Sequence, residues 1–211
     1  MHRFLYNRLR LAILIGLLAL AGNSQAMTRN ILVLGDSISA GYGMSLEQGW
    51  VALFERELAE KYPQYTVVNA SISGETSGGG LRRLPELLEA HRPSLVIIEL
   101  GGNDGLRGYP VSQLRDNLRR LAALASDKGA KVILVPVAIP PNYGRRYTSA
   151  FSESFALVAS ETSSTLAPLI FGGVATDPDL MQADGIHPTA EAQPLLLDNI
   201  RPTVLEVLKQ L

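Results

Sequence analysis

The chain has 211 residues, with 19 Lys and Arg against 20 Asp and Glu, three His and no Cys. This length predicts one domain with a sizeable core. The net charge of -1 and the scattered arginine pairs argue against nucleic-acid binding, which needs a continuous basic surface. The absence of cysteine excludes disulfides, a catalytic thiol, a cysteine-ligated zinc site and an iron–sulfur cluster.

The first 26 residues have the three parts of a secretory signal peptide. Basic residues up to Arg10 precede an apolar run over 11–21, and the small residues Ser24 and Ala26 stand at -3 and -1 of a cleavage point after Ala26. A retained membrane anchor is the alternative, but this run is shorter than the ~20 apolar residues that span a bilayer. We therefore expect a signal peptide at 1–26 and a mature domain at 27–211, with 16 basic and 20 acidic side chains and no stable membrane insertion after cleavage.

After residue 30, short apolar runs alternate with longer segments of helical periodicity. Strands are predicted at 31–34, 66–69, 95–100 and 132–137, with a weaker one at 166–171. Helices are predicted at 46–62, 81–90, 111–126, 149–161 and 190–211, the last with a late start or a kink because it contains Pro194 and Pro202. Strands without polar alternation, separated by helices, indicate a three-layer α/β domain with a parallel sheet.

Three loops that leave predicted strands carry most of the unusual polar residues, at 35–39, 69–77 and 101–105. Because ligands of parallel sheets bind beyond the carboxyl ends of the strands, these loops form a candidate site. None has the spacing of a nucleotide-binding motif or of the G-x-S-x-G nucleophile elbow. Taken separately, each loop also fits an ordinary turn or helix cap.

Only one histidine is a plausible catalytic base. His2 lies in the predicted signal peptide, and His91 precedes the third strand, at the end of the sheet opposite the candidate loops. His187 follows Asp184 by three residues and precedes Pro188, which favours an extended backbone. A carboxylate so close could hold one ring nitrogen and leave the other as a base for a serine, although such a pair is more often a solvated turn.

Taken together, these segments resemble the SGNH (GDSL) hydrolase family. The matching blocks are Gly35-Asp36-Ser37-Ile38-Ser39, Ser73-Gly74-Glu75-Thr76, Gly102-Asn103-Asp104 and Asp184-Gly185-Ile186-His187-Pro188. The segments 69–76, 141–147 and 187–194 are most similar to the exported bacterial thioesterase I/protease I/lysophospholipase subgroup. Ile38 replaces the family's usual Leu, an apolar exchange of equal volume that costs little.

The resemblance implies a three-layer flavodoxin-like fold with a five-stranded parallel sheet. It also implies Ser37 as nucleophile, His187 as general base and then acid, and Asp184 as the residue that orients His187. The oxyanion would be bound by the backbone N–H groups of Ser37 and Gly74 and by the side-chain amide of Asn103. No metal or other cofactor is implied.

The expected function is hydrolysis of carboxylic esters or thioesters, of the arylesterase, acyl-CoA thioesterase or lysophospholipase type, through an acyl-enzyme on Ser37. The partner would be a small-molecule or lipid acyl ester, met in the periplasm or outside the cell. By resemblance, the loop at 140–147 would help to line the acyl cleft, although a plain surface connector fits its sequence equally well. A carbohydrate O-acetylesterase and a non-catalytic binding module on the same fold are the alternatives.

Overall fold

The computed structural model describes residues 28–211, so the predicted signal peptide lies outside the described residues. The elements, in chain order, are β1 (Arg29–Gly35), α2 (Ser37–Ala40), η1 (Leu46–Gln48), α3 (Trp50–Lys61), β2 (Tyr65–Asn69), α4 (Ser77–His91), β3 (Leu95–Glu99), α5 (Gly102–Leu106), α6 (Val111–Asp127), β4 (Lys131–Leu134), η2 (Pro141–Tyr143), α7 (Arg145–Thr162), β5 (Thr165–Leu166), η3 (Pro178–Leu180) and α8 (Gln193–Leu208). The η elements are single turns of 3₁₀-helix.

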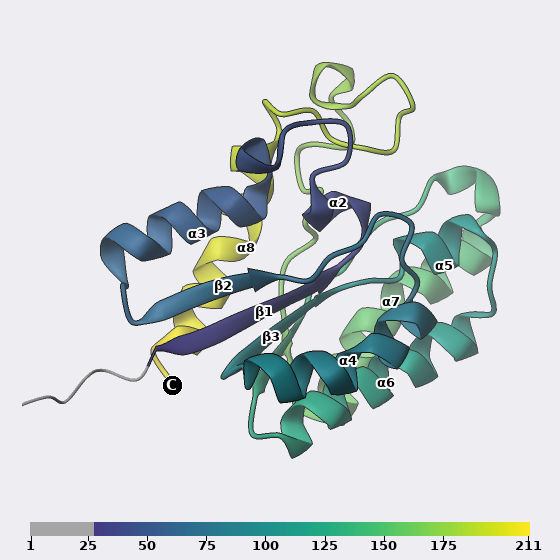
Figure 1. The fold of residues 1–211 in the computed structure, drawn as a ribbon. Coiled ribbons are helices and arrows are strands. Elements are labelled where there is room, and N and C mark those ends of the chain that lie inside the picture. The colour runs from purple at the N-terminus through teal and green to yellow at the C-terminus, as the bar shows by residue number, and fades with distance from the viewer. Residues whose placement is uncertain (1–27) are drawn as a thin grey trace, which may run out of the picture.

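The strands form one parallel sheet in the order β2-β1-β3-β4-β5, which confirms the predicted five-stranded α/β architecture. Helices α3 and α8 pack together on one face of the sheet, whereas α4, α6 and α7 form a layer on the other (Figure 1). The loops and short helices that follow the strands meet at the carboxyl edge. Any site built from them therefore lies beyond the ends of the strands.

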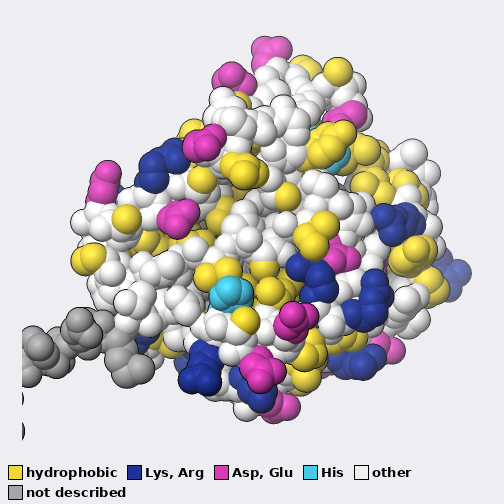
Figure 2. Space-filling model, viewed as in Figure 1, with side chains coloured by type: hydrophobic (Ala, Val, Ile, Leu, Met, Phe, Trp, Pro, Cys, Tyr) yellow, Lys and Arg dark blue, Asp and Glu magenta, His cyan; other side chains and the backbone are white. Residues whose placement is uncertain are grey.

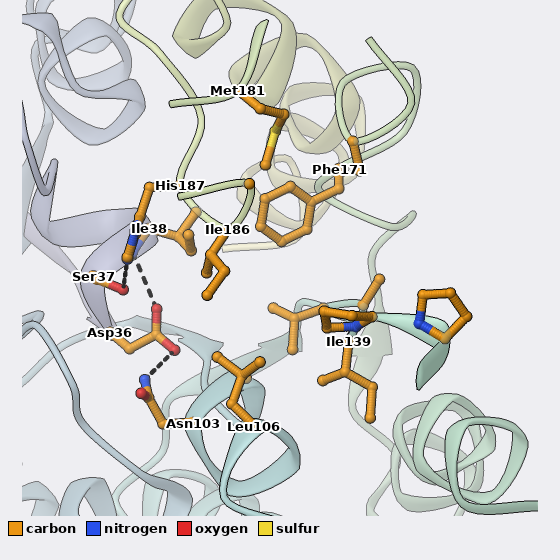
Figure 3. Close-up of a pocket in the computed structure, with 17 residues that line it drawn as sticks. Asp36, Ser37, Ile38, Asn103, Leu106, Ile139, Phe171, Met181, Ile186 and His187 are labelled. Carbon is orange, nitrogen blue, oxygen red and sulfur yellow. Dashed lines mark hydrogen bonds between the residues drawn. The ribbon is translucent and has the colours of Figure 1, made fainter. Parts of the chain in front are cut away.

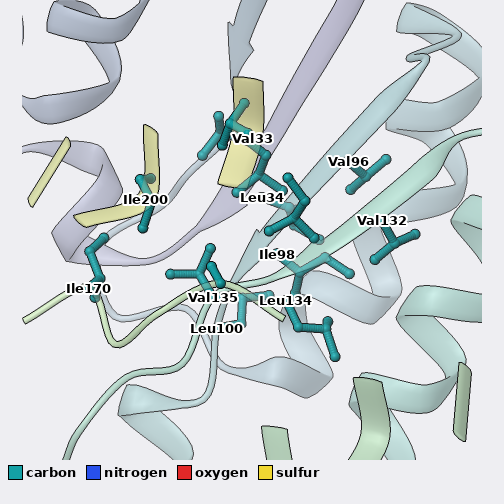
Figure 4. Close-up of a cluster of buried hydrophobic side chains, with 14 of the residues drawn as sticks. Val33, Leu34, Val96, Ile98, Leu100, Val132, Leu134, Val135, Ile170 and Ile200 are labelled. Atoms are coloured by element: carbon teal, nitrogen blue, oxygen red, sulfur yellow. The ribbon is translucent and has the colours of Figure 1, made fainter. Parts of the chain in front are cut away.

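The centre of the sheet is fully buried because helices cover both faces. Residues 31–34 of β1 and 95–98 of β3 are at most 1% exposed, which explains why their sequence lacks polar alternation. Figure 4 shows Val33 and Leu34 of β1 and Val96 and Ile98 of β3 together with side chains of β4 and α8, namely Val132, Leu134 and Ile200. The two halves of the chain thus share one core.

The fifth strand is much shorter than predicted. It pairs with β4 only at Thr165 and Leu166, whereas strand structure was expected through residue 171. Pro168 has no N–H group to donate, so the ladder ends beside it. Ile170 and Phe171 are nevertheless buried, because the loop that follows β5 turns back onto the core.

Two short helices, α2 and α5, stand where the sequence predicts only loops. The carboxylate of Asp36 caps α2 by accepting a hydrogen bond from the Ile38 backbone N–H at 3.1 Å. The late start predicted for the last helix is confirmed. Helix α8 begins at Gln193 with Pro194 in its first turn, where a missing N–H group costs nothing, and it continues through Pro202.

No helix within residues 28–211 has both the length and the apolarity needed to cross a membrane. On the face drawn in Figure 2, Lys and Arg side chains over α4 and α6 alternate with Asp and Glu. Ion pairs that involve α4 and α6 include Arg83 with Glu75 at 2.9 Å and Arg119 with Glu161 at 2.5 Å. This face therefore has no continuous basic stripe.

Candidate active site

Ser37 is the first residue of α2, directly beyond the carboxyl end of β1. The turn between β1 and α2 is tight. A Cβ atom at Gly35 would lie 2.7 Å from Ser39 and 2.8 Å from Glu99, so a larger residue would push the two elements apart. This close approach fixes Ser37 at the edge of the sheet, with its side chain facing the loop that contains His187.

The structure brings Ser37, His187 and Asp184 into one hydrogen-bonded chain. His187 Nε2 lies 2.9 Å from Ser37 Oγ, and His187 Nδ1 lies 2.7 Å from Asp184 Oδ2. His187 is held in a loop closed by a bridge between Met181 and Pro188. The expected grouping of these three side chains is therefore present, although 150 residues separate the serine from the histidine.

The carboxylate of Asp184 also accepts hydrogen bonds from the backbone. Its Oδ1 receives the N–H groups of Ile186 at 2.9 Å and His187 at 3.0 Å. Burial raises the pKa of Asp184, but these hydrogen bonds and the one from the imidazole outweigh it and lower the pKa to about 2. An ionised Asp184 can only accept, so Nδ1 carries the proton and Nε2 is left to accept from the Ser37 hydroxyl.

The two other expected oxyanion donors lie on neighbouring loops. Asn103 is the second residue of α5, and its Nδ2 donates to Asp36 Oδ2 at 3.0 Å (Figure 3). Gly74 follows β2 with φ of 79°, a conformation that glycine adopts without strain. Its carbonyl accepts a hydrogen bond of 2.9 Å from Arg107, which directly follows α5. This bond links the loop of Gly74 to the element that carries Asn103.

A pocket of about 480 Å³ opens beside Ser37. Its polar end is formed by Asp36, Ser37, Asn103 and His187, as Figure 3 shows. The remainder of its lining is mostly hydrophobic and includes Ile38, Leu106, Val137, Ile139, Phe171, Met181 and Ile186. A small polar end and an apolar body suit a ligand with one reactive polar group on a hydrophobic chain.

The loop at 140–147 contributes to this pocket, as the resemblance implies. Pro140 and Pro141 lie in the lining. The hydroxyl of Tyr143 donates to the carbonyl of Leu106 at 2.6 Å, which ties the loop to the end of α5. The loop is therefore more than a surface connector.

Two buried carboxyl groups beneath Ser37 were not predicted as site residues. Burial raises the pKa of Asp36 to about 6, against the opposing effect of hydrogen bonds from Ile38 and Asn103. Burial also raises the pKa of Glu99 well above its usual value, and the nearby charge of Asp36 adds to this. Asp36 is visible in the sequence as part of the first block, but nothing in the sequence indicates that Glu99 at the end of β3 lies against it.

Tyr42 is a third neighbour that the sequence analysis missed. Its ring centroid lies 4.3 Å from that of His187, with 36° between the ring planes. Tyr42 is about half exposed and covers one face of the imidazole. Only the tertiary structure reveals this contact, since the two residues belong to distant segments.

The acidic residues Asp177 and Asp179 lie at the turn η3. Among residues 28–211, no group of three or more His, Asp or Glu side chains is placed to hold a metal ion. Asp177 instead caps the turn η3 by accepting the Asp179 N–H at 3.0 Å. Its role is local and structural.

Comparison with known proteins identifies the family of this chain. Residues 33–194 match the GDSL-like Lipase/Acylhydrolase family. The chain is 51% identical over 201 residues to esterase TesA of Pseudomonas aeruginosa, covering 95% of this chain and all of that protein. It is 46% identical over 174 residues to thioesterase 1/protease 1/lysophospholipase L1 of Escherichia coli K12, covering 82% of each.

A solved structure of an esterase has the same fold as this chain. The psychrotrophic esterase EstA from Pseudoalteromonas sp., inhibited by monoethylphosphonate, is 43% identical and superposes with a TM-score of 0.82, over 86% of this chain and 99% of that one. With a family match over most of the chain and relatives of this similarity, this protein belongs to the GDSL-like lipase/acylhydrolase family and is an ester-bond hydrolase.

Proposed function

We propose that this protein is a serine esterase in which Ser37 is the nucleophile, His187 the general base and then acid, and Asp184 the residue that orients His187. The observation that carries this proposal is the 2.9 Å contact between Ser37 Oγ and His187 Nε2 at the polar end of an apolar pocket. A hydroxyl is a weak nucleophile until a base accepts its proton, and this geometry supplies that base.

The proposed reaction has two halves. Ser37 Oγ attacks the carbonyl carbon of the ester while its proton passes to His187 Nε2, which then protonates the leaving oxygen or sulfur. The developing oxyanion would receive hydrogen bonds from the Ser37 and Gly74 backbone N–H groups and from the Asn103 amide. Water, deprotonated by His187, then attacks the acyl carbon; the bond to Ser37 Oγ breaks, His187 returns the proton to Ser37 Oγ, and the carboxylic acid is released.

The hydrophobic lining supports a substrate with an apolar acyl group. We propose carboxylic esters and thioesters of small molecules or lipids, with the acyl chain lying against Leu106, Ile139 and Phe171. The related proteins are named as an esterase and as a thioesterase/lysophospholipase, which agrees with this class. A carbohydrate O-acetylesterase would need a polar pocket for the sugar, and this lining argues against it.

We also propose that the chain is exported, with residues 1–26 removed as a signal peptide and 27–211 as the active domain. The basic start, apolar run and small residues before position 27 support this. Amino-terminal sequencing of protein recovered outside the cytoplasm should begin at Met27. Recovery of active protein that begins at Met1 would contradict the proposal.

The decisive experiment is labelling with a fluorophosphonate, which reacts with activated serine hydroxyls. We expect a single label, at Ser37, and no label in Ser37→Ala. The hydrolysis of p-nitrophenyl esters of increasing acyl length should then be lost in Ser37→Ala and should favour acyl groups longer than acetyl in the wild type. An unlabelled protein would indicate a binding module, and a preference for acetylated xylan would indicate the carbohydrate esterase.

A further inference from the structure

The proposed mechanism leaves Asp36, the residue before the nucleophile, without a role. Its side chain is 2% exposed, so its carboxyl oxygens depend on protein partners. Oδ1 accepts the backbone N–H of Ile38 at 3.1 Å, and Oδ2 accepts Nδ2 of Asn103 at 3.0 Å (Figure 3). The two oxygens therefore do different things: one caps α2, and the other holds a side chain from α5.

The contact with Asn103 matters because of the torsion it restricts. The last side-chain torsion of asparagine is broad, so a free amide samples many orientations. The NH₂ group has two hydrogens, and a carboxylate that holds one of them fixes the direction of the other. A donor aimed in advance at the developing oxyanion stabilises the transition state more than one that must reorient during the reaction.

We infer that Asp36 is a positioning residue, which holds the Asn103 amide so that its second N–H group points at the oxyanion. The inference rests on the proposed function of Asn103 as an oxyanion donor. It assigns the two oxygens of Asp36 separate roles. Oδ1 caps α2, whereas Oδ2 supports catalysis by orienting the Asn103 amide.

Neighbouring groups on two sides restrict the movement of Asp36. A Cβ atom at Gly102 would lie 3.2 Å from Asp36 Oδ2, tighter than ordinary contact, so glycine there leaves room for the carboxylate. On the other side, Glu99 Oε2 accepts the Asp36 backbone N–H at 3.4 Å and the hydroxyl of Ser39 at 2.7 Å. Asp36 thus has little freedom to move away from Asn103.

One substitution separates the two contacts. Asp36→Asn has the same shape and keeps one oxygen to accept the Ile38 N–H. It replaces the other oxygen with an NH₂ group, so the side chain at position 36 has one acceptor in place of two. When that oxygen keeps the Ile38 cap, the NH₂ group faces the NH₂ group of Asn103, and the hydrogen bond from Asn103 is lost.

The experiment is a double-mutant cycle of Asp36→Asn and Asn103→Ala, with kcat and KM measured on one p-nitrophenyl ester. We expect Asp36→Asn alone to lower kcat by about 10- to 100-fold with little change in KM, less than the ~10²–10³-fold expected for complete loss of a donor. In the Asn103→Ala background, Asp36→Asn should change kcat by less than about 2-fold, because the group it orients is absent. Asp177→Asn is the matched control, since Asp177 makes the same cap contact to residue i+2 without a hydrogen bond to Asn103, and its kcat should match the wild type.

Equal losses from Asp36→Asn in both backgrounds, or unchanged kcat in the wild-type background, would overturn the inference. If Asp36→Asn fails to fold, Gly102→Ala tests the same contact, because its Cβ atom would crowd Asp36 Oδ2 and displace it from Asn103. Gly102→Ala should then lower kcat in the wild-type background and not in the Asn103→Ala background. The fluorophosphonate label and the Ser37→Ala variant are run in parallel. Failure of the proposed function would remove the wild-type label, whereas failure of this inference alone would leave the label intact.

Discussion

The carboxylate of Asp184 bonds both to the imidazole of His187 and to the backbone of the loop around it. Asp184 receives two backbone N–H groups and the imidazole N–H, so the turn and the ring are fixed by one side chain. This arrangement explains why residues only three positions apart can act as a pair. The loop geometry and the proposed tautomer of His187 depend on the same ionised group.

Asp184→Asn should therefore lower kcat by about 10²–10⁴-fold while the loop stays folded. The amide oxygen can still accept the two backbone N–H groups, but its NH₂ group faces Nδ1 and favours the tautomer with the proton on Nε2. That tautomer cannot accept the Ser37 proton. The measurement is kcat on a p-nitrophenyl ester together with the melting temperature. Near-normal activity would show that Ser37 and His187 suffice as a dyad.

Tyr42 is expected to stabilise His187 when it carries a proton during the reaction. An aromatic face attracts a cation, and this ring lies 4.3 Å from the imidazole. Tyr42→Leu should lower kcat by about 2- to 5-fold, the size of an exposed cation–π interaction, and Tyr42→Phe should keep most of the activity. A loss in Tyr42→Phe as large as in Tyr42→Leu would instead assign the effect to the hydroxyl.

At the scale of elements, the site depends on two very short helices. α2 carries Ser37 and α5 carries Asn103. Helices of four and five residues are too short to show a hydrophobic period, so a sequence pattern cannot reveal them. Each follows closely on a strand, and α5 is also tied to the start of α4, because Asp104 accepts hydrogen bonds from the backbone N–H and the hydroxyl of Ser77.

The glycines of α4 test this packing. A Cβ atom at Gly80 would lie 2.4 Å from Leu100 and 3.5 Å from Leu34, both fully buried, so Gly80→Ala should cost about 1–3 kcal/mol of unfolding free energy. A Cβ atom at Gly78 meets only ordinary contacts, so Gly78→Ala should be neutral or stabilising by up to about 1 kcal/mol. Urea unfolding of both variants is the measurement. Equal stabilities would show that α4 does not need this close approach.

At the scale of the whole molecule, the protein keeps an ionisable group in its core. Glu99 is fully buried at the end of the central strand β3, where it accepts the hydroxyl of Ser39. Burial raises the pKa of Glu99, so the folded protein retains a proton that the unfolded chain releases near pH 4.5. The contribution of Glu99 to folding stability therefore falls as the pH rises above this value.

Glu99→Gln should remove this pH dependence. In the wild type, Glu99 lowers the free energy of unfolding by up to about 1.4 kcal/mol per pH unit between the pKa of the unfolded chain and that of the folded protein. The neutral amide of Gln has no such effect. The variant should match the wild type near pH 4 and become relatively more stable towards neutral pH. Urea unfolding across this pH range measures the difference, with the exposed Glu60→Gln as control. Parallel curves for wild type and Glu99→Gln would contradict the prediction.

The sequence alone predicted the parallel α/β fold, and it singled out Ser37, Asp184 and His187, which the structure joins in one hydrogen-bonded chain. Buried strands appear in a sequence as short apolar runs, and amphipathic helices appear as a helical period. Residues with catalytic chemistry, such as histidine, can be counted directly. Contacts between segments distant in the chain have no local signal. The tertiary structure alone decided that Asp36 meets Asn103, that Glu99 lies buried beneath them, that Tyr42 covers His187, and that the fifth strand ends beside Pro168. Each of these contacts depends on which loops the open parallel sheet brings together at its carboxyl edge, and the packing of the elements determines this.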